Sequence, residues 1–78
     1  MRNIYAENVT ANLIKLFKEK RLEKGLSHQT LADMAGLNRS TISRVESGER
    51  TPTITVCLKI AQALDIKLYS LLQEVEDA

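Results

Sequence analysis

Apolar residues recur along this chain every three or four positions, and glycines interrupt the recurrence. Such spacing places apolar side chains on one face of a helix. Gly25 and Gly36 follow two of these stretches and occupy the position at which many helices end. The pattern predicts an all-α fold of five helices and no strand, in one domain with a core of about residues 11–75. The helices are expected near residues 7–24, 28–35, 39–47, 54–64 and 68–75.

The same spacing indicates which side of the last two helices faces the core. In the fourth helix the inward residues are expected to be Ile54, Cys57, Leu58, Ala61 and Leu64. In the fifth, apolar residues with the spacing i, i+3, i+4 and i+7 form one stripe: Leu68, Leu71, Leu72 and Val75. Cys57 is interpreted as a small core residue, the alternative being a reactive thiol, and a single cysteine cannot form an internal disulfide.

The central stretch from His28 to Ser47 has the pattern of two short helices joined by a tight turn. Gly36 provides the residue that tolerates positive φ, and Ala32 is small enough to let the second helix cross closely. Asn38 is expected to cap the second helix by accepting from its free amides. Two short helices with a glycine turn and no interior proline indicate a helix-turn-helix.

The second of these helices has a polar outward face. Ile42 and Val45 share one side, and the opposite side carries arginines and short hydroxyl residues. Arginine donates two hydrogen bonds to guanine O6 and N7 in the major groove, and serine donates or accepts there. We therefore expect base contacts from Arg39, Ser40, Ser43 and Arg44, the alternative being an ordinary solvated helix face.

The packing positions Leu31, Ala32, Gly36, Ile42 and Val45 resemble those of the lambda-repressor-like (Xre/Cro) helix-turn-helix family. The flanking segments RLEKGLS and ESGERTPT resemble it too, so the likeness extends over about residues 16–72. It implies a five-helix lambda-repressor-like DNA-binding domain that acts as a transcriptional regulator on double-stranded DNA. Small relatives include restriction-modification controller proteins, although these commonly differ after the recognition helix.

Several residues around the helix-turn-helix are expected to contact DNA phosphates. Ser27 is the expected cap of the first motif helix, whose free amides and dipole attract an anion. The resemblance implies a phosphate contact for Arg50, in a loop that lies along the DNA backbone in relatives. Relatives usually have glutamine where His28 stands, so an ordinary surface histidine is the alternative at that position. The predicted phosphate contacts are His28, Gln29, Asn38, Ser47 and Arg50.

Two charged residues fall on faces that otherwise point inward. Arg21 lies four residues after Phe17, and Glu46 lies four residues after Ile42. A charge on a buried face is costly unless it is paired, and these two have opposite signs. The family resemblance implies the same pairing. We expect a structural ion pair that holds the first helix against the recognition helix, rather than two independently exposed side chains.

The net charge of +1 conceals a polarised distribution. Residues 15–50 contain eight Lys/Arg and five Asp/Glu, whereas residues 65–78 contain four acids and one lysine. The acidic end is therefore expected to point away from DNA. One recognition helix reads too few base pairs for a regulator, which favours a homodimer on a (pseudo)palindromic operator. Its predicted interface is Tyr69, Leu72 and Val75, the alternative being that the whole stripe packs inward.

Other classes of function find little support in the residues. One histidine and one cysteine do not make a four-ligand metal site, so neither a metal nor a cofactor is expected. His28 and Asp33 are the only hint of an acid-base pair and lack a nucleophile, so an enzyme is not expected. No apolar run reaches membrane-spanning length, and a cytoplasmic protein is expected. The alternative function is a protein-interaction module, such as the antitoxin of a toxin-antitoxin pair.

Overall fold

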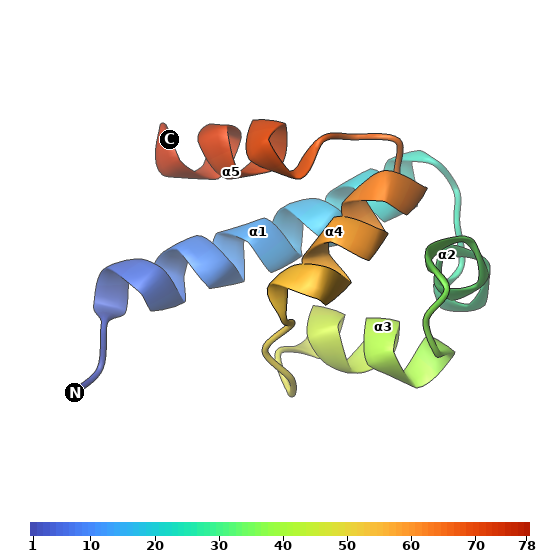
Figure 1. The fold of residues 1–78 in the computed structure, drawn as a ribbon, viewed down its shortest axis with the longest axis horizontal. Coiled ribbons are helices and arrows are strands. Elements are labelled where there is room, and N and C mark those ends of the chain that lie inside the picture. Colours follow the sequence, from blue (N-terminus) through green and yellow to red (C-terminus); the bar gives the residue numbers. More distant parts are fainter.

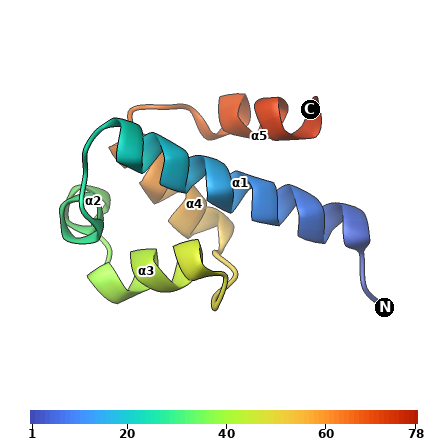
Figure 2. The same cartoon turned by 180° about the vertical axis from the view of Figure 1, so that it is seen from behind.

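Five helices and no strand make up the computed structural model, which describes all 78 residues. The helices are α1 (Ile4–Glu23), α2 (His28–Ala35), α3 (Arg39–Ser47), α4 (Ile54–Ala63) and α5 (Leu68–Glu76). Figure 1 shows α1 crossing the middle of the molecule, with α5 antiparallel to it on one side and α3 on the other. The view from behind in Figure 2 shows the same order of layers. The predicted all-α, five-helix fold is confirmed.

The first helix begins at Ile4, three residues before the predicted start at residue 7. Asn3 is the N-cap, and its side-chain oxygen accepts a hydrogen bond from the Ala6 amide at 2.9 Å. This bond satisfies one of the amides that the first turn leaves without an intrahelical partner. The predicted start lay too far along the chain because apolar spacing is weak in residues 4–8. There the Asn3 cap, and not burial of side chains, determines where the helix begins.

Two helix ends show how the chain reverses direction. Gly36 has φ +67°, and the Leu37 amide donates to the Ala32 carbonyl at 2.9 Å across the turn. After α4 the left-handed position is taken by Asp65, with φ 59°, and the Ile66 amide donates to the Ala61 carbonyl at 3.0 Å. Aspartate tolerates this conformation better than most residues other than glycine. The helix therefore ends at Ala63 without a glycine to signal it.

The buried core draws side chains from every helix. Phe17 of α1 packs in one cluster with aliphatic side chains of the other four helices: Leu31, Ile42, Ile60, Leu64 and Leu71. Cys57 belongs to this cluster, and burial raises the pKa of its thiol, as expected for a structural residue. Each buried aliphatic or aromatic side chain stabilises the fold by about 1.5–3 kcal/mol. The cluster fixes α3 on the rest of the domain.

One part of the predicted core is wrong. Ile54 and Leu58, expected to point inward, expose 64% and 52% of their surface. The core side of α4 is formed by Cys57, Ile60 and Ala61, on which α2 and α5 pack. Ile54 and Leu58 lie on the neighbouring stripe, which no helix of this chain covers.

Candidate nucleic-acid interface

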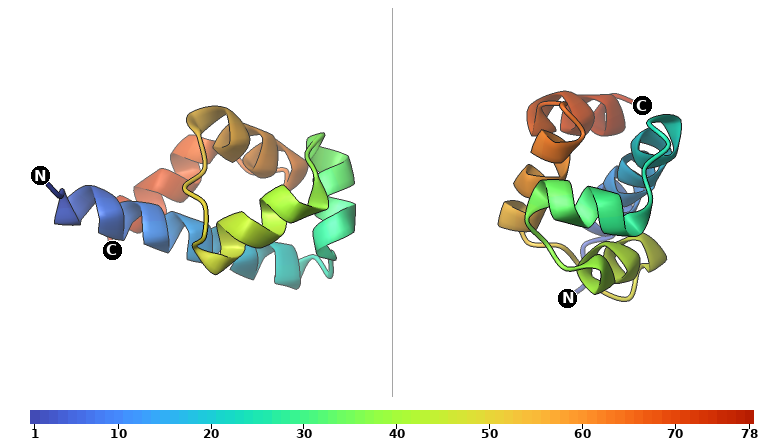
Figure 3. Two further views of the ribbon diagram at one scale, coloured as in Figure 1. Left: turned by 90° about the horizontal axis from the view of Figure 1, so that it is seen from below. Right: turned by 90° about the vertical axis from the view of Figure 1, so that its right-hand side faces the viewer.

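The two motif helices pack so that α3 presents one side to solvent. Ile42 and Val45 are buried, while Arg39, Ser40 and Arg44 are exposed. Ser43, the fourth predicted base-reading residue, is half-buried at the edge of this face. Viewed from below in Figure 3, α3 lies in front of the molecule with α1 along one side and α4 along the other. The exposed side of α3 thus forms a ridge of hydrogen-bonding side chains on a helix whose inner side is buried in the fold.

The two arginines of this ridge are only lightly engaged within the molecule. Arg44 Nε lies 4.0 Å from Glu49 Oε2, at the limit of an ion pair, and both side chains are mostly exposed. A contact of this kind between exposed groups contributes little and breaks easily. The guanidinium groups of Arg39 and Arg44 are therefore free to bind an external acceptor.

Asn38 occupies the N-cap position of α3, but its side chain makes no capping hydrogen bond. The expected cap is therefore wrong in its chemistry, although right in its position. Ser27, by contrast, caps α2, with its hydroxyl oxygen accepting from the Thr30 amide at 3.1 Å. The amide of Asn38 and the exposed guanidinium of Arg50 lie near opposite ends of α3, where an external anion has access to both.

The other predicted phosphate contacts already have partners within the molecule. His28 Nε2 lies 3.2 Å from Glu46 Oε1, and the Gln29 amide donates to Asp33 Oδ1 at 2.8 Å. The Ser47 hydroxyl donates to the carbonyl of Arg44 at 3.1 Å. Binding a phosphate would require each side chain to give up or share this bond. Their role as phosphate contacts stays a prediction.

Arg21 and Glu46 lie in contact beneath the recognition helix. Arg21 Nε donates to Glu46 Oε2 at 2.7 Å, and its Nη2 donates to Oε1 at 2.9 Å. Its third donor, Nη1, bonds to the carbonyl of Leu26 at 2.7 Å. Arg21 is 8% exposed, and the two-bond geometry matches the planar guanidinium to the carboxylate. The structure thus brings together the two residues that were expected to form a structural ion pair.

His28 adds a third member to this cluster, which sequence reasoning missed. Burial alone raises the pKa of Glu46, but hydrogen bonds from Arg21 and His28 outweigh burial and hold the pKa below its ordinary value of 4.5. The carboxylate therefore stays charged and links α1, α2 and α3. Residue spacing pointed to Arg21 and Glu46 but carried no sign that His28 turns toward them.

The helix-turn-helix family (HTH_3) matches residues 17–71, which are more than half of the chain. The chain belongs to this family. The match extends from the core residue Phe17 through the motif to Leu71, and confirms the resemblance that the packing residues indicated. It places the protein among DNA-binding transcriptional regulators.

Individual relatives differ in how much of their length this helix-turn-helix protein spans. The crystal structure of the restriction-modification controller protein C.AhdI from Aeromonas hydrophila is 38% identical, with a TM-score of 0.74, covering 83% of this chain and 97% of that one. The transcriptional regulator SinR of Bacillus subtilis is 38% identical over 58 residues, covering 73% of this chain and 52% of SinR. The putative regulator MJ1164 of Methanocaldococcus jannaschii is 36% identical over 66 residues, covering 81% of this chain and 21% of that protein. The chain thus spans about half of SinR and a fifth of MJ1164.

The predicted dimer residues of this helix-turn-helix protein lie on α5, on the far side of the molecule from α3 (Figure 1). Tyr69 is exposed, whereas Leu72 and Val75 are half-buried and pack against the core. The acidic end of the chain is bonded to the first helix, since the Tyr5 hydroxyl donates a hydrogen bond to Glu76 Oε1. This bond raises the pKa of Tyr5. The acids therefore lie away from the arginine ridge.

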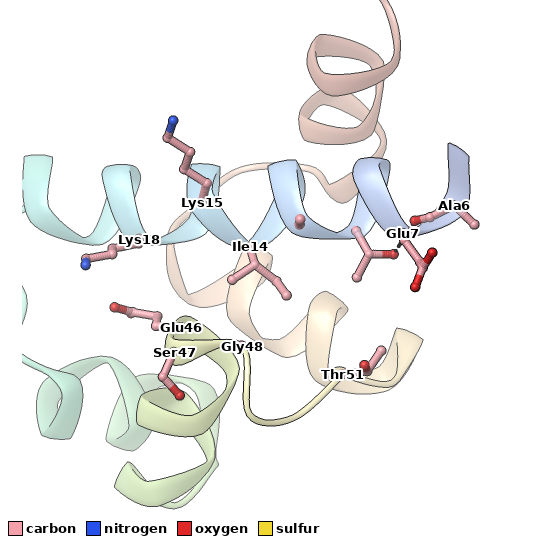
Figure 4. Close-up of a pocket in the computed structure, with 11 residues that line it drawn as sticks. Ala6, Glu7, Ile14, Lys15, Lys18, Glu46, Ser47, Gly48 and Thr51 are labelled. Carbon is pink, nitrogen blue, oxygen red and sulfur yellow. Dashed lines mark hydrogen bonds between the residues drawn. The ribbon is translucent and has the colours of Figure 1, made fainter. Parts of the chain in front are cut away.

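A hollow of about 610 Å³ separates the first half of α1 from the end of α3 (Figure 4). Ile14 points into it, Lys15 and Lys18 lie on its α1 side, and Ser47 and Gly48 lie opposite. Its two acids are both paired, Glu46 with Arg21 and Glu7 with Arg2 at 3.1 Å. In Figure 4 the side chain of Lys15 projects away from α3, and Lys18 lies at the α1 edge of the hollow. None of the five helices combines the length and apolar character that crossing a membrane requires.

Proposed function

We propose that this protein is a sequence-specific regulator of transcription that binds duplex DNA as a homodimer on a (pseudo)palindromic operator. The observation that carries the proposal is the exposed ridge of α3, where Arg39, Ser40 and Arg44 lie outside the buried core. Such a ridge matches the major groove, which admits a helix and presents distinct acceptors for each base pair. Ser43 is the fourth proposed base contact, at the edge of the ridge.

Phosphate contacts position a recognition helix but do not read sequence. Asn38 and Arg50, at the two ends of α3, are the proposed residues for this role with the fewest competing bonds. Gln29, Ser47 and His28 are proposed as additional contacts that exchange an internal partner for a phosphate. The free amides at the start of α2, next to the cap Ser27, also favour an anion beside His28 and Gln29.

A second copy is part of the proposal because one recognition helix contacts only a few base pairs. Competition from a genome of non-specific sites demands more contacts than one helix provides. Two copies related by a two-fold axis double the contacts and place half-sites about one helical turn apart. The surface proposed from the sequence for this contact is Tyr69, Leu72 and Val75.

The likeness to C.AhdI supports a more specific role. The similarity covers 97% of C.AhdI but only 52% of SinR, so C.AhdI is a relative that is matched over nearly its whole length. Its description as a restriction-modification controller leads us to propose a controller-type regulator.

Selection from a pool of random duplex DNA tests the proposal. The purified protein is expected to enrich one sequence with two-fold symmetry, and anisotropy should then show tighter binding to it than to a scrambled duplex of equal length. Specific binding is typically about 10³–10⁷ times tighter than non-specific binding, so the contrast is readily measured. Failure to enrich any sequence, with equal affinity for all duplexes, would refute sequence-specific binding.

A further inference from the structure

His28 belongs both to the buried cluster beneath α3 and to the surface of the domain. Its Nε2 lies 3.2 Å from Glu46 Oε1, the carboxylate that also binds Arg21. Its side chain is nevertheless 33% exposed, and His28 is the first residue of α2, where the amides of the first turn have no intrahelical partners. One imidazole ring thus contacts the inner cluster and also reaches the place where a DNA phosphate is proposed to bind.

The carboxylate of Glu46 determines which ring nitrogen of His28 carries the hydrogen. Burial raises the pKa of Glu46, but hydrogen bonds from Arg21 and His28 lower it further, to below 4.5. Above that pH the carboxylate is ionised and only accepts hydrogen bonds. A neutral imidazole has one N–H group, and its other nitrogen is an acceptor that a carboxylate oxygen would repel. In neutral His28 the hydrogen therefore lies on Nε2, and Nδ1 has none.

The second ring nitrogen of His28 is accessible from outside. Among residues that are not exposed, every buried side-chain nitrogen or oxygen has a hydrogen-bond partner. His28 is half-buried, and its one side-chain hydrogen bond is the contact of Nε2 with Glu46. Nδ1 has no partner and is therefore in contact with solvent. A phosphate oxygen can approach it, but a DNA phosphate only accepts hydrogen bonds, and Nδ1 of the neutral ring has none to donate.

We propose that His28 binds a DNA phosphate only in its protonated form, with Nε2 donating to Glu46 and Nδ1 donating to the phosphate, so that each copy takes up a proton when it binds DNA. A protonated imidazole has two N–H donors and serves two acceptors at once. This inference rests on the proposed DNA binding. For His28 it replaces the exchange of one partner for another by a bridge between both.

Exchange is the less favourable alternative for this side chain. To donate from Nδ1 while neutral, the ring must move its hydrogen away from Nε2. Nε2 would then face Glu46 Oε1 as a second acceptor at 3.2 Å. The carboxylate is 8% exposed, so water has little access to replace the lost donor. Protonation keeps the existing hydrogen bond and adds the new one.

Charges on the neighbouring helices explain why the proton arrives with the phosphate. From α3, Glu46 attracts a proton on His28. From α1, Arg21 is paired with this carboxylate, and Lys18 lines the same hollow as Glu46 in Figure 4. The two cations outnumber the one anion, so the cluster offers no net negative charge to an imidazolium. A phosphate supplies that charge, and a nearby negative charge favours the protonated form of an imidazole.

Other titratable groups near α2 are engaged elsewhere. Asp33 accepts a hydrogen bond from Gln29 at 2.8 Å. On α4, Lys59 lines the hollow beside α5, and burial raises the pKa of the Cys57 thiol, which stays neutral. His28 is the only histidine of the chain. Histidine is the side chain that ordinarily changes charge between about pH 5 and 8, so a pH dependence of DNA binding in this range reports on His28.

The pH dependence of DNA binding in wild type and in His28→Gln tests the inference. Anisotropy measures the affinity for a duplex between about pH 5.5 and 7.5. We expect wild-type affinity to rise as pH falls, by up to about tenfold per pH unit and per copy, the limit for uptake of one proton. A scrambled duplex should show the same dependence, because phosphate contacts do not read sequence.

His28→Gln is the matched variant, because an amide nitrogen carries hydrogens at every pH. Its affinity for DNA should not vary over the same pH range. Circular dichroism compares its helix content with that of wild type. A pH dependence that the variant shares with wild type would assign the titration to another group and overturn the inference.

Two measurements on wild type alone do not depend on the variant. Calorimetry in buffers with different heats of ionisation counts the protons taken up, and we expect up to about one per copy at neutral pH. The slope of log affinity against log salt should be steeper by about one unit at the acid end of the range, because the protonated ring adds one phosphate contact. A histidine that only supported the inner cluster would leave this slope unchanged.

The inference and the proposed function fail in different ways. DNA binding by wild type without proton uptake, or with weaker binding in acid, would overturn the bridge by His28 and leave the proposed regulator standing. If wild type bound no duplex at any pH in the range, the proposed DNA binding would be refuted, and the inference with it.

Discussion

Arg21 and Arg39 differ in burial and in the hydrogen bonds that their guanidinium groups make. Arg21 is 8% exposed, and three of its nitrogens donate hydrogen bonds, two to Glu46 and one to the carbonyl of Leu26. Arg39 stands on the exposed ridge of α3, beside Arg44, whose contact with Glu49 is 4.0 Å long. The two regions lie on neighbouring faces of the same short helix, since Glu46 belongs to α3 as well.

The difference shows that partners, and not residue type, decide whether a charge is structural or available. A guanidinium removed from water must be fully hydrogen-bonded, so the inner site holds its charges in one geometry. An exposed guanidinium keeps its hydration and exchanges it for a ligand at modest cost. The inner cluster positions α3, and the outer ridge uses that position to present donors.

The largest expected effect comes from breaking the inner cluster. Glu46→Gln leaves the buried guanidinium of Arg21 without a counter-charge, and removal of one partner of a buried pair typically costs about 3–5 kcal/mol. Urea unfolding of the variant should show a loss of stability of this size. A loss below about 0.5 kcal/mol, the range of ordinary surface changes, would contradict a structural role for the cluster.

The pH dependence of stability provides the matching control. The pKa of Glu46 is lowered in the folded protein, so its contribution is present above its ordinary value of 4.5 and is lost as pH falls through the lower, folded-state pKa. Wild type should therefore lose this contribution in acid below pH 4.5. The difference in the free energy of unfolding between wild type and Glu46→Gln should become smaller over the same range. A constant difference across the acid range would mean that the carboxylate charge is not what stabilises the fold.

The outer ridge should respond in binding and not in stability. Arg39→Ala or Arg44→Ala is expected to lose about 1–3 kcal/mol of operator binding and to relax preference at one base position. Stability should stay within about 0.5 kcal/mol of wild type, because neither side chain supports the core. Anisotropy on a set of single-base operator variants measures both quantities. Equal losses on operator and scrambled DNA would exclude base reading by these residues.

Arg50→Ala tests the phosphate contact, where a smaller and sequence-independent effect is expected. One lost phosphate contact should reduce the slope of log affinity against log salt by about one unit, for operator and scrambled DNA alike. Lys24→Ala, which removes an exposed charge just past the end of α1, serves as the matched control and should leave the slope unchanged. A loss restricted to the operator would instead assign Arg50 to base reading.

The smallest effect is expected from Glu49→Gln. The substitution removes the acid beside Arg44 and should strengthen DNA binding by a few tenths of a kcal/mol, since exposed ion pairs contribute about 0–1 kcal/mol. Titrations at low and high salt measure the gain, which should shrink as salt screens the pair. Weaker binding by the variant would show that Glu49 positions Arg44 for DNA instead of competing for it.

The amino-acid sequence by itself determined the helices, the helix-turn-helix and the chemistry of the α3 ridge. These features depend on short-range spacing: apolar periodicity, the turn at Gly36, and arginines and serines on one side of nine residues. It also pointed to Arg21 and Glu46 as partners, because a charge on an apolar face needs an opposite charge. The first three features depend on residues close together in the sequence. The Arg21–Glu46 pairing follows from the rule that a buried charge needs a partner, which holds for any packing of the helices.

Only the tertiary structure decided which faces are covered and which side chains meet. Apolar spacing could not separate the core residue Cys57 from the exposed Leu58 beside it, because the width of the buried stripe depends on where α2 and α5 pack. Nor could it show that His28 turns toward Glu46, a contact between residues 18 positions apart. Burial and long-range hydrogen bonds depend on the relative placement of whole helices, which many weak contacts determine together.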